Sequence, residues 1–232
     1  MSDPRSSLDV MARPQKSTAP DQSVGRLDLA WQGSLFDTGQ VSYDPALTGC
    51  QRRHLGEGAW VDHLPGWLGG ADGLFARLLD ETPWSQHRRW MYERKVTEPR
   101  LTHRWYLDTE PDRDPAPDLL VEIAAALSAH YGVMFSQVGV NLYRNGSDSV
   151  AWHGDRIARE LPEAIVALIS LGAVRPLRLR PKGGGRSLTY LPGPGDLLVM
   201  GGSCQRTWDH AVPKISASGP RISIQFRHVY PR

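Results

Sequence analysis

A histidine and an aspartate two positions apart are the first residues of this chain whose types and spacing indicate chemistry. They are His153 and Asp155, and on a β-strand residues i and i+2 project to the same side. His210 follows about 55 residues after Asp155, and the intervening strands could return it to the same place. Two histidines and one carboxylate that leave coordination positions open are a ligand set typical of non-haem Fe(II). An isolated H-x-D pair is usually a solvated surface pair, so this interpretation needs support from other residues.

The last predicted strand carries polar side chains that could bind a small anion. In "RISIQFR", residues 221–227, alternate residues share a face, so one face is apolar and the other polar. Arginines form bidentate, charge-assisted pairs with carboxylates, and two of them six residues apart suit a dicarboxylate. The alternative is an amphipathic edge strand with solvated arginines. The polar face holds Arg221, Ser223, Gln225 and Arg227.

An earlier stretch, "NLYRN", adds two neutral hydrogen-bond donors. Asn141 and Tyr143 share one strand face about ten residues before His153. An amide and a phenol can both donate to a carboxylate. The alternative for this pair is ordinary cross-strand packing.

Short strands after about residue 136 must position these side chains. Two helices are predicted before them: residues 71–81 repeat apolar residues with helical spacing, and residues 117–132 run from a Pro-Asp start signal to a glycine stop signal. There is no alternating strand–helix rhythm, so we expect an α+β protein with a sandwich or barrel-like β core. The predicted strands lie in segments 136–145, 164–172, 176–181, 187–192, 193–202 and 220–230.

The composition indicates how many domains the chain forms and in which cellular compartment it is expected. The 232 residues are 40% hydrophobic, which suits one domain with one sizeable core. Two cysteines cannot form a disulfide framework, and no apolar run approaches the roughly 20 residues needed to span a bilayer. Residues 1–25 are rich in Ser, Pro, Asp and Gln and are predicted to be a disordered tail. We expect a soluble, cytoplasmic monomer with no membrane association.

In order and spacing, these residues resemble the AlkB family of Fe(II)/2-oxoglutarate-dependent nucleic-acid demethylases. The resemblance covers roughly residues 60–228. Within it, "MYERKVTEPRLTHRWY", residues 91–106, is similar to the nucleotide-recognition region of that family. The matching motifs are N-x-Y at 141–143, H-x-D at 153–155, His210, and R-x-x-x-x-x-R at 221–227.

The resemblance implies a fold, a set of cofactors and a role for each matching residue. Residues 26–232 would form a single Fe(II)/2-oxoglutarate dioxygenase domain, with a double-stranded β-helix (jelly-roll) core at about 136–230, N-terminal helices, and a nucleotide-recognition lid at about 60–110. His153, Asp155 and His210 would bind Fe(II). Arg221, helped by Asn141 and Tyr143, would hold the far carboxylate of 2-oxoglutarate; Ser223 stands between the arginines where the family often has Asn, and Arg227 would lie near Asp155.

The resemblance also implies the reaction. O2 and 2-oxoglutarate would be consumed, succinate and CO2 released, and an N-methyl group of a base such as 1-methyladenine or 3-methylcytosine lost as formaldehyde. DNA is the expected substrate, with RNA as a second candidate. Two departures leave the preferred base open: Arg156 and Ile157 follow H-x-D where an acidic residue is common, and no "YTYSG"-like segment follows Tyr106.

A nucleic-acid partner needs cationic groups for phosphates and aromatic rings for stacking. Residues 87–104 contain six Lys or Arg against two acids, and residues 175–186 contain five basic residues and no acid. The alternative for both stretches is a solvated charged surface. Trp105 and Tyr106 are candidates to stack on the base, whereas Trp152 is expected to face away from the metal and pack in the core. The candidate phosphate contacts are Arg94, Lys95, Arg100, Arg178, Arg180, Lys182 and Arg186.

Two rival functions remain open from the residues. The same iron site could serve a hydroxylase or demethylase of tRNA, a protein or a small molecule. The chain could also be a non-catalytic nucleic-acid-binding module, although both arginines and all three metal ligands are intact.

Overall fold

The structure is a computed structural model, and it describes residues 22–25, 27–33, 39–91, 94–107, 114–155, 161 and 163–228. A disordered tail was predicted for residues 1–25. Of these, residues 1–21 lie outside the described residues. Its end is not tail-like, because β1 (Gln22–Ser23) pairs with β6 (Ser85–Gln86).

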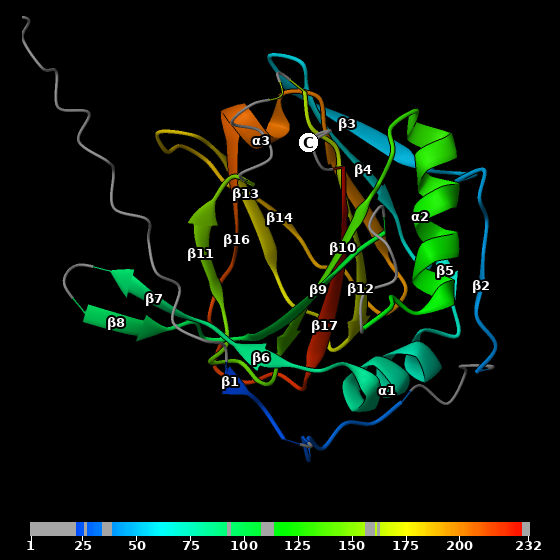
Figure 1. The fold of residues 1–232 in the computed structure, drawn as a ribbon. Helices are drawn as coiled ribbons and strands as arrows, with labels where there is room; N and C mark the ends of the chain where they lie inside the picture. The colour runs from blue at the N-terminus through cyan, green and yellow to red at the C-terminus, as the bar shows by residue number, and fades with distance from the viewer. Residues whose placement is uncertain are drawn as a thin grey trace, which may run out of the picture.

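Two antiparallel sheets form the body of the protein (Figure 1). The major sheet has nine strands, in the order β1, β6, β9 (Leu101–Tyr106), β10 (Gln137–Tyr143), β17 (Arg221–Arg227), β12 (Val166–Gly172), β15 (Leu197–Gly201), β4 (Ala59–Leu64) and β3 (Gln51–Gly56). The smaller sheet has four, in the order β11 (Val150–His153), β16 (Trp208–Val212), β13 (Leu177–Pro181) and β14 (Leu188–Tyr190). Two short ribbons pair β2 (Ser42–Tyr43) with β5 (Leu68–Gly69) and β7 (Arg88–Met91) with β8 (Arg94–Thr97).

Both predicted helices are confirmed, and they lie along the outer side of the major sheet (Figure 1). α1 (Ala71–Glu81) and α2 (Asp118–Tyr131) turn their apolar faces to one hydrophobic core, which they share with Ile222, Ile224 and Phe226 of β17. Gly132 ends α2 with φ 66°, a left-handed conformation that glycine adopts at little cost. A third helix, α3 (Cys204–Thr207), is a single turn between β15 and β16.

A second apolar cluster includes residues of both sheets. Val166 and Met200 of the major sheet and Leu179 and Val212 of the smaller sheet are among its buried members. The polar row of β17 lies on the face opposite Ile222, Ile224 and Phe226, because side chains alternate along a strand. The predicted alternation of β17 is therefore confirmed.

The alternative of an edge strand with solvated arginines is wrong. β17 pairs with β10 on one side and β12 on the other, and Arg221 is fully buried.

The segment predicted as a lid, residues 60–110, is divided between two structural roles. β4 and β9 are strands of the major sheet, so the prediction that these parts belong to a lid is wrong. The pairing of β4 with β15 buries Val61 and Asp62 within the sheet, which a mobile cover would not allow. The ribbon β7–β8 instead projects away from the body (Figure 1). None of the helices in the described part of the chain has the length and apolar character that crossing a bilayer requires.

Candidate metal centre and anion pocket

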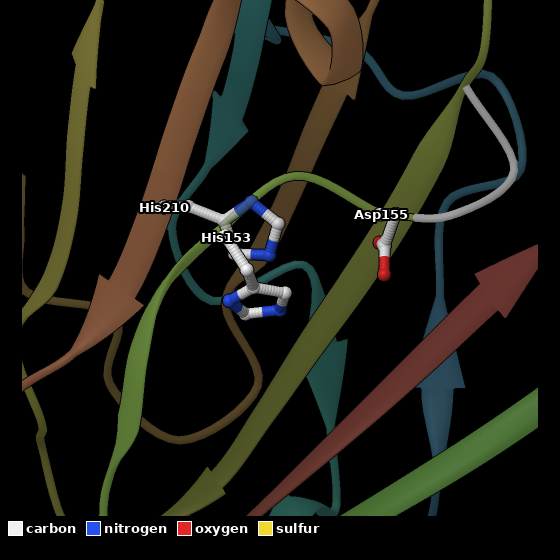
Figure 2. A group of neighbouring side chains, drawn as sticks. All are labelled: His153, Asp155 and His210. Atoms are coloured by element: carbon white, nitrogen blue, oxygen red, sulfur yellow. The ribbon is translucent and has the colours of Figure 1, made fainter. Parts of the chain in front are cut away.

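The two histidines and the aspartate lie together between the sheets. β11 pairs with β16 so that His153 lies opposite His210, and their ring centroids are 4.2 Å apart. Asp155 follows two residues after His153, just past the end of β11. One ligand atom from each of the three residues lies within 4.8 Å of the other two. Figure 2 shows the two imidazoles side by side and the Asp155 carboxylate on the adjoining segment.

Both imidazoles are suited to metal binding in their neutral form. The Nδ1 atom of His153 lies 2.8 Å from the carbonyl oxygen of Ala151. A carbonyl can only accept, so Nδ1 carries the proton and Nε2 keeps a lone pair for a metal. Burial, with a smaller contribution from His153, lowers the pKa of His210 to about 3, and His210 is therefore neutral near pH 7.

Asp155 is held as a carboxylate by Arg227. Burial by itself raises the pKa of this carboxyl group, but Arg227 and the two histidines outweigh it and lower the pKa to about 2. The Arg227 Nε and Nη2 atoms lie 3.3 Å from the two carboxylate oxygens. An ionised carboxylate beside two imidazoles is a suitable set of donors for a divalent transition metal.

Arg221 is a buried cation with unused donors. Its side chain is 0% exposed, and its Nε donates to the hydroxyl of Ser170 at 2.9 Å. Within the part of the chain that the structure describes, Nη1 and Nη2 have no hydrogen-bond partner. Its Cζ lies 5.4 Å from the ring of Tyr143, and burial lowers the pKa of Arg221 to about 10. A buried guanidinium with two unsatisfied nitrogens is chemically suited to an anion.

Residues 63–227 match the family model of the 2OG-Fe(II) oxygenase superfamily. This chain belongs to that superfamily. Its cofactors are Fe(II), 2-oxoglutarate and O2. The donor set around Asp155 fits the metal, and the unpaired nitrogens of Arg221 fit a carboxylate of the dicarboxylate.

Several relatives resemble this chain over about two thirds of its length. The alpha-ketoglutarate-dependent dioxygenase alkB homolog 3 of Bos taurus is 34% identical over 180 residues, covering 69% of this chain and 62% of that protein. The Homo sapiens protein of the same name is 32% identical with the same coverage. The DNA oxidative demethylase ALKBH2 of Arabidopsis thaliana is 30% identical over 192 residues, covering 67% of this chain and 61% of that protein. The chain thus spans about 62% of the length of the alkB homolog 3 relatives.

A solved structure of a 2OG-Fe(II) oxygenase family protein from Burkholderia pseudomallei is also similar. It is 15% identical to this chain, with a TM-score of 0.49, and the match covers 72% of this chain and 84% of that one.

An amide network lines the candidate site between its two arginines. Gln225 donates from Nε2 to the Ser223 hydroxyl at 2.6 Å and to the Ser223 carbonyl at 2.7 Å. Its Oε1 accepts from Nδ2 of Asn141 at 3.2 Å. An added Cβ at Gly139 would lie 3.2 Å from Nη1 of Arg227 and 3.5 Å from Oε1 of Gln225, so glycine leaves room for both side chains. Gln225 was not among the predicted site residues. Its position on the polar face of β17, between the two arginines, could have indicated it.

Two arginines of the predicted basic stretches have partners within the protein. Arg175 is 0% exposed and donates to the carbonyls of Asn145, Asp148 and Pro213, each at 2.8 Å, so it fixes the turn that follows β10. Arg100 was predicted to contact phosphate, and in the structure it is engaged in an ion pair. Its side chain is only 16% exposed and pairs with Glu98 at 2.8 Å.

The pairing of β9 with β10 separates the two predicted stacking residues. Trp105 lies opposite Val138, and both belong to the core under the helices. Trp105 is only 4% exposed, so the prediction that it stacks on a base is wrong: its strand face is the one covered by the helical layer. Tyr106 lies opposite Gln137, on the face shared with the site, and is 41% exposed.

The other predicted phosphate contacts surround the smaller sheet or fall outside the described residues. Arg178 and Arg180 share a face of β13, as predicted, but it is the face opposite Leu179, which points into the second core. Cζ of Arg180 lies 4.2 Å from the ring centre of Trp152, so Trp152 is half-buried under a cation rather than packed in the core. Lys182 and Arg186 are exposed at the β13–β14 connection. The side chains of Arg94 and Lys95, and residues 156–160, lie outside the described part.

Proposed function

We propose that this chain is an Fe(II)/2-oxoglutarate-dependent dioxygenase that demethylates N-alkylated bases such as 1-methyladenine and 3-methylcytosine in DNA. The observation that carries the proposal is the placement of the His153, Asp155 and His210 cluster and the unsatisfied guanidinium of Arg221 on facing sheets. The similarity to an alkB homolog 3 dioxygenase and to a DNA oxidative demethylase supports this choice of substrate.

His153, Asp155 and His210 would hold the iron. When bound, Fe(II) would activate O2 at the expense of 2-oxoglutarate, which becomes succinate and CO2, and the hydroxylated N-methyl group would leave the base as formaldehyde. Arg227 keeps Asp155 ionised and fixes the direction of its carboxylate. Neutral His210 needs to lose no proton before it binds a metal at neutral pH.

Arg221 would bind the far carboxylate of 2-oxoglutarate through Nη1 and Nη2. Tyr143 lies beside this guanidinium, and its phenol stays protonated because burial raises its pKa. Its O–H group can therefore donate to the same anion. Asn141 and Ser223, fixed by Gln225, would line the path toward the metal.

We further propose that the antiparallel sheets form a double-stranded β-helix and that the β7–β8 ribbon acts as the lid. Tyr106 would stack on the extruded base, because it is exposed and its strand pairs with the strand that carries Asn141. Arg94, Lys95, Arg178, Arg180, Lys182 and Arg186 would contact phosphates, which predicts binding that weakens as salt rises.

The test uses oligonucleotides that carry one 1-methyladenine or one 3-methylcytosine, in single-stranded DNA, duplex DNA and RNA. They are incubated with enzyme, Fe(II), 2-oxoglutarate and ascorbate, and the loss of each methyl group is followed by mass spectrometry. Wild type should restore the base, and Asp155→Ala should not. Repair by Asp155→Ala would contradict the iron assignment. Turnover of 2-oxoglutarate with every methylated strand untouched would point to a protein or small-molecule substrate instead.

A further inference from the structure

A buried glutamine on α3 contacts the backbone of the metal-site aspartate. Gln205 is 1% exposed, and its Oε1 accepts from the main-chain N–H of Asp155 at 3.1 Å. Asp155 lies past the last residue of β11, so ladder hydrogen bonds of that strand do not hold its backbone. The contact joins segments that are 50 residues apart in the chain.

Gln205 is itself fixed from several directions. Its Nε2 lies 3.8 Å from Sδ of Met200, and its main-chain oxygen accepts from Nζ of Lys182 at 3.2 Å. Gly154 packs directly on that same oxygen, since an added Cβ there would lie only 2.6 Å from it. The segment that carries Asp155 therefore rests on the main chain of Gln205 and hydrogen-bonds to its side chain.

We propose that Gln205 is a positioning residue for the metal, acting through Asp155. Arg227 orients the Asp155 carboxylate, whereas Gln205 fixes the backbone from which that carboxylate projects. Both are needed to set the ligand oxygen relative to His153 and His210, because a side chain can be no better placed than its Cα atom. Residues that orient metal ligands typically contribute a factor of 10 to 100 in metal affinity. This inference rests on the iron assignment of the proposed function.

The first experiment compares two substitutions of similar length. Gln205→Met removes the acceptor, and Gln205→Glu keeps an oxygen for the Asp155 N–H. The affinity for Mn(II) alone is measured by titration calorimetry on the full chain, without O2 turnover. We expect Gln205→Met to weaken Mn(II) binding by about 10- to 100-fold and Gln205→Glu by less than about threefold. Gln51→Met, the same substitution at an exposed glutamine of β3, is the matched control and should bind as wild type.

Equal Mn(II) affinity in wild type and folded Gln205→Met would overturn the proposal, and so would an equal loss in both Gln205 variants. A wild type that binds no Mn(II) would instead contradict the iron site of the proposed function. Hydrogen–deuterium exchange on the metal-free wild type gives a test that needs no variant. The Asp155 amide should exchange slowly, and exchange at the rate of an unprotected amide would also overturn the proposal.

Discussion

Arg227 and Asp155 form a bidentate ion pair between the sheets, and both nitrogen–oxygen distances are 3.3 Å. Arg227 belongs to β17 of the major sheet, and Asp155 follows β11 of the smaller one. Their side chains are 18% and 13% exposed, so solvent screens the pair only in part. The pair thus links the docking of the two sheets to the charge of a metal-site carboxylate.

Replacing Arg227 should weaken metal binding most at low pH. In Arg227→Met the burial of Asp155 is no longer offset by the guanidinium, so the pKa of Asp155 rises from its value of about 2. We expect the Mn(II) affinity to fall about tenfold or more and its pH dependence to become steeper between pH 5 and 7. Arg227→Lys retains the positive charge but cannot form the bidentate pair. Its Mn(II) affinity should lie between those of wild type and Arg227→Met. A pH profile of Mn(II) affinity parallel to wild type would contradict this role.

Arg221 should govern the apparent affinity for 2-oxoglutarate. Arg221→Met removes a hydrogen-bonded charge partner, a change of about 1.5–3 kcal/mol, which corresponds to roughly 10- to 150-fold in KM for 2-oxoglutarate. Steady-state kinetics with varied 2-oxoglutarate measures it. Arg178→Met, an exposed arginine on the outer face of β13, is the control and should leave this KM unchanged. An unchanged KM in Arg221→Met would mean that another group binds the co-substrate.

Gln225 should act on 2-oxoglutarate through Ser223 and Asn141. Gln225→Ala releases both side chains, and one lost hydrogen bond of about 1 kcal/mol predicts roughly a fivefold weaker binding of 2-oxoglutarate. Adding Ser223→Asn to Gln225→Ala brings an amide back to the same place and should recover most of the loss. Binding is measured under anaerobic conditions by titration calorimetry with Mn(II) present. A double variant no better than Gln225→Ala would exclude this arrangement.

Trp105 and Tyr106 should have opposite effects although they are neighbours. Trp105→Ala empties a site in the core under the helices and should lower the free energy of unfolding by about 3–5 kcal/mol. Tyr106→Ala should change stability by less than about 1 kcal/mol but reduce kcat/KM for a methylated oligonucleotide about 5- to 100-fold, because a stacked base is lost. Urea unfolding and mass-spectrometric kinetics measure the two quantities. Full activity in Tyr106→Ala would remove this residue from the substrate site.

The metal-free protein should lose stability as the pH falls below about 6.5. His210 has a pKa of about 3 in the folded protein against an ordinary value of 6.5. Between these two pH values the unfolded chain binds a proton at His210 and the folded chain does not. The loss of stability vanishes about one pH unit above 6.5 and grows by up to about 1.4 kcal/mol per pH unit toward pH 3. Urea midpoints of wild type and His210→Asn between pH 7 and 5 measure it. The difference between the two proteins should shrink as the pH falls; a constant difference would contradict the buried neutral state of His210.

The local patterns of the sequence determined which side chains share a face. Period-two alternation placed Arg221 and Arg227 together, and helical spacing gave α1 and α2. These features depend on residues within one strand or a few helical turns, so short-range geometry is sufficient to predict them. The H-x-D spacing likewise indicated that His153 and Asp155 lie close together.

Only the tertiary structure decided which face meets which neighbour. The pairing of β11 with β16 brought His210 to His153, and the pairing of β9 with β10 sent Trp105 to the core and Tyr106 to the site. A shift of one residue in either register would have reversed these assignments. The contact of Gln205 with Asp155 spans 50 residues and depends on how α3 packs against the end of β11. Strand order and register are set by the burial of whole sheets, and no single stretch of sequence contains that information.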